Sequence, residues 1–274
     1  MEKITKLKPT QPIGIFDSGI GGLTVANAIA KALPKEQIIY FGDTAHLPYG
    51  DKSPDSIKYY SIRIAQFLMQ QNCKMIVVAC NTASALAYET VKDFVGDRIP
   101  VIDVVEPVVE EIVKDKKIKH IGVIATKGTI KSDIYARKIK EKNKHLTVAS
   151  QATPLLASMI EEGFFNNKIS RTIIFDYLSR PKIKKIDSLI LACTHYPLIR
   201  KEVEEFYHGK VKIYDNAEVV AKKVAGVLKH MKLLAPKKGG PHHFYVSDYT
   251  KSFEESSKFF FPSKIKLQEA SIWK

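Results

Sequence analysis

Two of the three cysteines in this 274-residue chain stand in matching surroundings. Cys80 lies in VVACNTAS (77–84) and Cys193 lies in ILACTHYP (190–197), each after an apolar run and before polar residues. An isolated cysteine beside a strand is most often a small buried hydrophobe, and we interpret Cys73, in QNCKM, in that way. The matching surroundings of the other two indicate that both thiols are functional and that they act as a pair.

Functional thiols most often serve as metal ligands or as nucleophiles. The spacing disfavours a zinc site, because Cys193 and His195 are only two residues apart and the chain has no C-x-x-C motif. Three other histidines are unconvincing as the further ligands that a tetrahedral site needs: His46, His242 and His243. A cysteine–histidine nucleophile would leave the second cysteine unexplained. We therefore predict no metal.

A glycine-rich turn follows the first predicted strand, in GIFDSGIGGLT (14–24). Turns of this kind often cradle the phosphates of a dinucleotide. Here Asp17 and Ser18 stand at the strand end, where the carboxylate would repel phosphate. The glycine spacing also differs from G-x-G-x-x-G, and no Walker lysine follows. Asp17 therefore suits an ammonium group or a proton transfer better than a phosphate.

Apolar runs alternate with segments of helical period, which is typical of an α/β fold with mainly parallel strands. Strands are predicted at residues 12–16, 37–41, 75–79, 99–105, 120–126, 188–192, 210–214 and 243–247. Helices are predicted at residues 23–33, 57–69, 83–94, 129–140, 155–163, 170–179, 198–207 and 217–234. Ile13 precedes Cys80 by nearly as many residues as Ile121 precedes Cys193, so the two halves look like tandem copies.

The repeat predicts two pseudo-equivalent, Rossmann-like (flavodoxin-like) domains with the active site in the cleft between them. Ligands of such sheets bind beyond the carboxyl ends of the strands, so we expect both cysteine loops to face one cleft. The strand at 210–214 is expected to return to the first sheet, because VKIYDN resembles one of its core strands. The predicted first domain therefore comprises residues 12–105 and 213–274, and the second comprises residues 106–212.

The composition is that of a globular protein, with 45% hydrophobic and 26% charged residues. No apolar run approaches the roughly 20 residues of a membrane helix. The opening MEKITKLKPTQP lacks the apolar region of a secretory signal. Three cysteines make no disulfide framework and fit a reducing cytoplasm, so we predict a soluble cytoplasmic protein.

The formal net charge of +14 raises the question of nucleic-acid binding. The lysines are spread along the chain, for example in the segments 114–120, 138–145 and 180–185, and no nucleic-acid motif accompanies them. The pattern favours a solvated surface, or a mild attraction for an acidic substrate.

Five motifs together resemble those of the bacterial glutamate racemases, in the same order and with the same spacing. They are GIFDSGIGGLTV (14–25), FGDTAHLPYG (41–50), VVACNTASA (77–85), EEG (161–163) and ACTHYPL (192–198). The resemblance covers roughly residues 12–216, while the remainder is similar in length and expected topology. It implies a cofactor-independent isomerase that acts on glutamate and supplies D-glutamate for peptidoglycan. A homodimer is the default assembly.

The resemblance also implies roles for particular residues. Racemisation removes a proton from one face of the α-carbon and returns one to the other, so it needs an acid/base group on each side. One thiol must be ionised, which requires lowering its pKa from an ordinary value of about 8.5. The implied catalytic residues are Cys80, the base toward D-glutamate, assisted by Asp17, and Cys193, the base toward L-glutamate, assisted by His195 and Glu161.

In the same way, the resemblance implies which residues bind the substrate. They are Asp17, Ser18, Pro48, Tyr49, Gly50, Asn81, Thr82, Thr126, Thr129, Thr194 and His195. The side-chain carboxylate of glutamate is expected near Thr126 and Thr129. Glu162 is the alternative to Glu161 as the acidic partner of His195.

Two alternatives remain open on the sequence. Aspartate racemase, hydantoin racemase and maleate isomerase share the two-cysteine arrangement and differ in substrate. A protein that keeps the fold and binds nucleic acid or a topoisomerase is the other alternative, and the net charge is its only local support.

Overall fold

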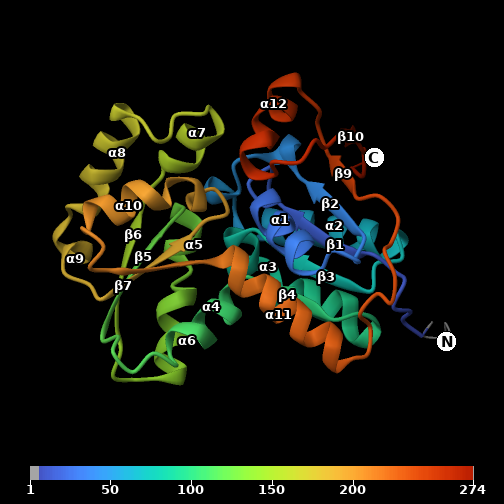
Figure 1. Cartoon of the computed structure of the whole chain (residues 1–274), viewed down its shortest axis with the longest axis horizontal. Coiled ribbons are helices and arrows are strands. Elements are labelled where there is room, and N and C mark those ends of the chain that lie inside the picture. Colours follow the sequence, from blue (N-terminus) through green and yellow to red (C-terminus); the bar gives the residue numbers. More distant parts are fainter. Residues whose placement is uncertain (1–5, 274) are drawn as a thin grey trace.

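The computed structural model describes residues 6–273, and in them two parallel β-sheets lie side by side with helices around each (Figure 1). The first sheet has the order β10-β9-β2-β1-β3-β4. Its strands are β1 (Ile13–Asp17), β2 (Ile38–Gly42), β3 (Met75–Val78), β4 (Val101–Asp103), β9 (His243–Val246) and β10 (Leu267–Glu269). Neighbouring strands run parallel throughout.

The second sheet has the order β6-β5-β7-β8 and is also parallel. Its strands are β5 (His120–Ala125), β6 (Thr147–Ala152), β7 (Ser188–Ala192) and β8 (Lys212–Asp215). The central strands of the first sheet, β2-β1-β3-β4, have the same relative order, which is that of the flavodoxin-like fold. The predicted fold class, two α/β units of one type, is confirmed.

Helices connect the strands in both units, as parallel strands require. They are α1 (Leu23–Ala32), α2 (Pro54–Gln70), α3 (Asn81–Val95), α4 (Val105–Ile112), α5 (Lys127–Lys131), α6 (Ile134–Lys142), α7 (Leu156–Glu161), α8 (Lys168–Leu178), α9 (Pro181–Lys184), α10 (Arg200–Phe206), α11 (Asn216–His230) and α12 (Lys251–Phe260). Short 3₁₀ turns include η2 (Tyr49–Asp51) and η4 (Tyr196–Ile199). Strands β1, β2 and β7 are buried along their whole length, which is why they read as continuous apolar runs.

The strand expected at 210–214 belongs to the other sheet. Strand β8 pairs with β7, with Leu189 opposite Ile213 and Ile190 opposite Tyr214. The expectation that this strand returns to the first sheet is wrong, and the expected boundary at residue 213 falls inside β8. The connection through α10 is short, so the chain adds β8 beside β7 before it leaves the second sheet.

The chain returns to the first unit through α11 instead of through a strand. Helix α11 starts directly after β8 and packs against α1 and α4 (Figure 1). The expected return of the strand at 243–247 is confirmed, because β9 pairs with β2 in the first sheet. The C-terminal part therefore belongs to the first unit from α11 onward.

Two local expectations were incomplete. Strand β6, with the sequence TVASQA, was not expected, because it lies at a sheet edge, is only partly buried, and lacks an apolar run. The helix expected at 129–140 is two helices, since Asp133 interrupts it with a φ of 55°, in the left-handed region. Both differences leave the strand ends that carry the cysteines unchanged.

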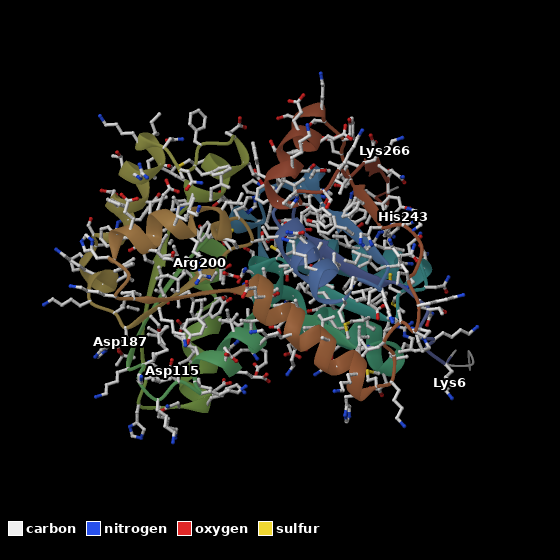
Figure 2. All side chains as sticks on the ribbon, in the orientation of Figure 1. Lys6, Asp115, Asp187, Arg200, His243 and Lys266 are labelled. Atoms are coloured by element: carbon white, nitrogen blue, oxygen red, sulfur yellow. The ribbon has the colours of Figure 1, made fainter. Side chains whose placement is uncertain are left out.

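Charged side chains surround both units. Figure 2 shows Lys6 and Lys266 at the periphery of the first unit, and Asp115 and Asp187 at the periphery of the second. Many lysines are paired with carboxylates, among them Lys223 with Glu110 (2.9 Å). This arrangement fits the expectation of a solvated surface. Within residues 6–273, no helix combines the length and the apolar character needed to cross a membrane.

Candidate active site

Four strand ends converge on one cavity between the two units. In the first sheet Asp17 ends β1 and Cys80 follows β3, while in the second Thr126 follows β5 and Cys193 follows β7. Each pair of strands is adjacent in its sheet and is the place where parallel sheets of this type bind ligands. The cavity has a volume of about 170 Å³ and is lined by Ser18, Leu47, Pro48, Tyr49, Gly50, Cys80, Asn81, Thr82, Thr126, Ala157, Ser158, Glu161, Cys193, Thr194 and His195.

Most residues that the sequence singled out meet at this cavity, and two lie just outside its lining. Asp17 is fully buried under the glycine-rich turn, and Thr129 lies behind Thr126. Leu47, Ala157 and Ser158 were not predicted. Helical spacing gives a signal for the last two, because they stand four and three residues before Glu161 on α7 and so share its face.

Cys80 sits at the start of α3 among neutral hydrogen-bonding groups. Its Sγ accepts a hydrogen bond from the backbone N–H of Ala83 (3.5 Å), and its thiol donates one to Ser18 Oγ (3.6 Å). Burial raises the pKa of Cys80 to about 12, and the negative charge of Asp17 adds to the rise. Cys80 is therefore a thiol at neutral pH in this structure.

Asp17 holds the glycine-rich turn in place from below. Its Oδ2 accepts hydrogen bonds from the backbone N–H groups of Gly19 (3.1 Å) and Gly22 (3.0 Å). Burial raises its pKa, while the positive charge of His195 and these two N–H groups oppose the rise. Thr194 Oγ1, 3.5 Å from Asp17 Oδ1, joins the carboxylate to the other cysteine loop.

Cys193 lies against a charged pair. His195 Nδ1 is 3.6 Å from Cys193 Sγ, and His195 Nε2 is 2.7 Å from Glu161 Oε1. Burial lowers the pKa of His195, but the Glu161 carboxylate and the Cys193 sulfur raise it more, so that the net value lies well above 6.5. The imidazole is thus held protonated. Glu162 is exposed at the helix end, so Glu161 is the residue that contacts His195.

The C-terminal helix α12 supports this pair from behind. The ring of Phe260 packs edge-on against the imidazole of His195, with the ring centres 5.2 Å apart. Ser256 Oγ donates a hydrogen bond to the backbone carbonyl of Glu161 (3.0 Å). Nothing in the local sequence indicated these contacts, because α12 is distant in the chain from both residues.

Three threonine hydroxyls form a cluster that joins the two units. Thr82 Oγ1 of α3 is 2.9 Å from Thr126 Oγ1 and 3.2 Å from Thr129 Oγ1, and the latter two are 3.1 Å apart. Thr126 is also the N-cap of α5. Hydroxyl groups next to a helix N-terminus favour a carboxylate.

A buried carboxylate fixes the segment that contains Pro48, Tyr49 and Gly50. Tyr49 Oη donates a hydrogen bond to Asp43 Oδ2 (2.7 Å). Asp43 also accepts one from Ser247 Oγ at the end of β9 (2.7 Å). The C-terminal strand therefore helps to position this wall of the cavity.

Two glycines let the units approach one another. A Cβ at Gly21 would lie 2.3 Å from His195 Cε1, and a Cβ at Gly50 would lie 2.9 Å from Thr126 Cβ. Gly21 and Gly50 belong to the first unit, and the residues they face belong to the second. The requirement for glycine at these two positions is therefore steric, and it is separate from turn geometry.

Taken together, the residues around the cavity place one thiol against neutral hydrogen-bonding groups near the Asp17 carboxylate and a second thiol beside a cation. Such a site can take a proton from one side of a small molecule and return a proton from the other. No group of three or more His, Cys, Asp or Glu side chains within the described chain is arranged to hold a metal ion. Cys73 is buried and is not part of the cavity lining, and it packs beside Gly14 at the start of β1.

Known proteins resemble this chain over nearly its whole length. The profile of the Asp/Glu/Hydantoin racemase family matches residues 14–224. The glutamate racemase of Geobacter metallireducens is 43% identical over 258 residues, which cover 94% of this chain and 95% of that protein. The glutamate racemase of Chlorobaculum tepidum is 44% identical over 262 residues, which cover 95% and 96%.

A solved structure resembles the fold equally closely. The crystal structure of glutamate racemase from Francisella tularensis in complex with D-glutamate aligns with a TM-score of 0.91 and 39% sequence identity. The alignment covers 97% of this chain and 99% of that one.

Proposed function

Because this chain belongs to the Asp/Glu/Hydantoin racemase family, we infer that it is a glutamate racemase, and we propose that Cys80 and Cys193 are its two acid/base groups. The observation that carries the mechanism is that both cysteines line one cavity, each at the end of the third strand of its unit. The family and the close relatives carry the choice of glutamate.

In the proposed reaction the two thiols exchange protonation states. Starting from L-glutamate, the Cys193 thiolate takes the α-proton and the Cys80 thiol gives its proton to the opposite face, which yields D-glutamate. Cys193 is then a thiol and Cys80 a thiolate, which are the states that the reverse reaction needs. The protonated His195 supports an anion at Cys193, and the raised pKa of Cys80 supports a resting thiol there.

The carbanion formed between the two transfers needs stabilisation without an electron-withdrawing cofactor. The cavity is small and the part of its lining around the two thiols is buried, so that hydrogen bonds there act in a medium of low dielectric. The N-terminus of α3, beside Cys80, directs N–H groups and a positive dipole end toward this region. We propose that these groups hold the α-carboxylate as negative charge develops on it.

We further propose how the rest of the substrate lies. The hydroxyl cluster of Thr82, Thr126 and Thr129 suits the side-chain carboxylate of glutamate. Thr194 and Ser18 suit the groups around the α-carbon, because Ser18 contacts the Cys80 thiol and Thr194 contacts the imidazole that lies beside Cys193. Asp17 acts from beneath the lining by fixing the turn and by its charge.

The first test is circular-dichroism detection of L-glutamate and D-glutamate conversion by the purified protein without added cofactor. Cys80→Ser and Cys193→Ser should each lower kcat/KM by about 10³-fold. Because the equilibrium constant of a racemisation is one, kcat/KM should fall equally in both directions for each variant. Cys73→Ser, which changes the buried cysteine outside the cavity, is the matched control and should keep the rate.

Deuterated water separates the two-base route from a single-base route. Two bases predict that early product carries deuterium at the α-carbon while the remaining substrate keeps its proton. Deuterium entering the remaining substrate as fast as the product forms would refute the two-base assignment. Turnover of aspartate, a hydantoin or maleate in place of glutamate would keep the mechanism and correct the substrate.

Three further proposals concern the cellular setting. The cytoplasm suits a protein with three unpaired cysteines, two of them in the proposed mechanism. D-glutamate production would supply peptidoglycan synthesis, and depletion of the protein should be rescued by D-glutamate. A homodimer is proposed on general grounds and is tested by light scattering.

Salt-sensitive DNA retention that survives both cysteine substitutions would favour the nucleic-acid alternative.

A further inference from the structure

Three buried polar side chains meet at the residue that follows Cys80. They are Asn81, the first residue of α3, Tyr135 of α6, and Asn216, the first residue of α11. Each is 2% to 3% exposed. The first belongs to the first unit, while Tyr135 belongs to the second and Asn216 stands where the chain leaves the second sheet. The cluster therefore ties the site to the connection between the units.

The contacts give Asn81 a defined amide orientation. Asn81 Oδ1 accepts hydrogen bonds from Tyr135 Oη (2.6 Å) and from Asn216 Nδ2 (2.8 Å). With both of these donors on its oxygen, the nitrogen of the amide is directed away from the cluster. Asn81 Nδ2 is buried and has no hydrogen-bond partner among the described residues. Asn81 also lines the active-site cavity, so a buried donor without a partner lies in a residue of the cavity wall.

We propose that Tyr135 and Asn216 are positioning residues, which fix the Asn81 amide so that its N–H₂ group faces an anionic oxygen of the substrate. The inference rests on the proposed function, since it assigns residues that prepare the same cavity for a carboxylate. With both amides turned over, Asn81 Nδ2 would donate to Asn216 Oδ1 and Asn81 Oδ1 would face the cavity. That arrangement would repel a carboxylate.

Asn216→Asp tests the orientation directly. A carboxylate at position 216 only accepts hydrogen bonds, so the Asn81 amide must turn over to donate to it. KM for L-glutamate and D-glutamate should rise by about 50-fold, because the Asn81 carbonyl oxygen would then face a substrate oxygen and neither can donate a hydrogen bond. An acidic residue in the first turn of α11 suits the helix dipole, which favours folding of the variant.

Tyr135→Phe is the milder second variant, because it removes one of the two hydrogen bonds and keeps the ring. KM should rise by about fivefold, and kcat should change much less, because binding and not proton transfer is affected. The matched controls are Tyr88→Phe, which loses a hydroxyl contact to the Val101 carbonyl, and Asn143→Asp, which adds the same charge at the end of α6. Both controls should keep KM.

The possible failures are distinct. Absence of glutamate racemisation by the unaltered protein would refute the proposed function. Normal racemisation together with an unchanged KM in Asn216→Asp and Tyr135→Phe would overturn the positioning role alone. A fall in melting temperature with KM and kcat both unchanged would also overturn it, because it would show a purely structural cluster.

Discussion

The two cysteine loops occupy the same place in two units of one fold, yet their surroundings differ. Cys80 contacts a serine hydroxyl and a backbone N–H group. Cys193 contacts an imidazole that a glutamate keeps protonated. The sheet order places each thiol at a strand end, while the neighbouring side chains set its electrostatic surroundings. A repeated scaffold therefore places two groups of one kind in different electrostatic surroundings.

The largest effect is expected when the cation beside Cys193 is removed. His195→Ala should lower kcat/KM by about 10³-fold, because the thiolate proposed at Cys193 would lose its charged partner. Stopped racemisation assays by circular dichroism measure the loss. The control is His145→Ala, at an exposed position. Activity within tenfold of the unaltered protein would show that the two halves do not differ in the way described.

The next largest effect is expected when the negative charge that keeps His195 protonated is removed. Glu161→Gln removes the carboxylate that raises the pKa of His195, so the imidazole should lose its proton at a lower pH. The alkaline limit of activity should move down by about one to two pH units. Glu162→Gln is the matched control, one residue away and exposed. An unmoved pH profile in Glu161→Gln would assign the ionisation to another group.

Chemical modification compares the two thiols in one experiment. Their exposed fractions are similar, 5% for Cys80 and 8% for Cys193, so thiolate content should decide the reaction rate. Iodoacetamide at pH 7.5, without substrate, should alkylate Cys193 at least about tenfold faster. Peptide mass spectrometry follows both sites. Faster alkylation of Cys80 would reverse the assignment of the resting thiolate.

The smallest effect is expected on the neutral side. Ser18→Ala removes the hydroxyl that contacts Cys80, and it should lower kcat by about fivefold, the value of one neutral hydrogen bond. Steady-state kinetics in both directions measure it, with Ser179→Ala on the surface of the second unit as control. A loss of activity as large as that of His195→Ala would show that Cys80 and Cys193 depend equally on their neighbouring side chains.

The cysteine pair could be predicted because its signal is local. Each thiol follows a buried apolar run and precedes polar groups, and parallel strands bring such ends together. The sheet to which β8 belongs could not be predicted in the same way. Ile213 and Tyr214 indicate a strand with a buried centre, but the sequence does not show which strand lies beside it. Only the β7–β8 pairing shows that.

The supporting residues of the site were harder to find. Tyr135 lies in a helix where an aromatic residue suggests core packing, and Asn216 follows a strand as an ordinary helix start. Their meeting at Asn81 depends on how α6 and α11 lie against α3. Phe260 of α12 reaches His195 by the same kind of long-range packing. Contacts between distant segments leave no pattern in either segment alone.

The bare backbones at Gly21 and Gly50 set a limit on what the cleft can admit. A methyl group at either position would act as a spacer, because it would meet His195 or Thr126 of the facing unit before the two units reached their present separation. The width of the cleft thus depends on the lack of a side chain at these two positions. Alanine at position 21 would increase the distance between the two thiols, whichever ligand is bound. Substitutions elsewhere that are meant to enlarge the substrate range would have to keep this distance.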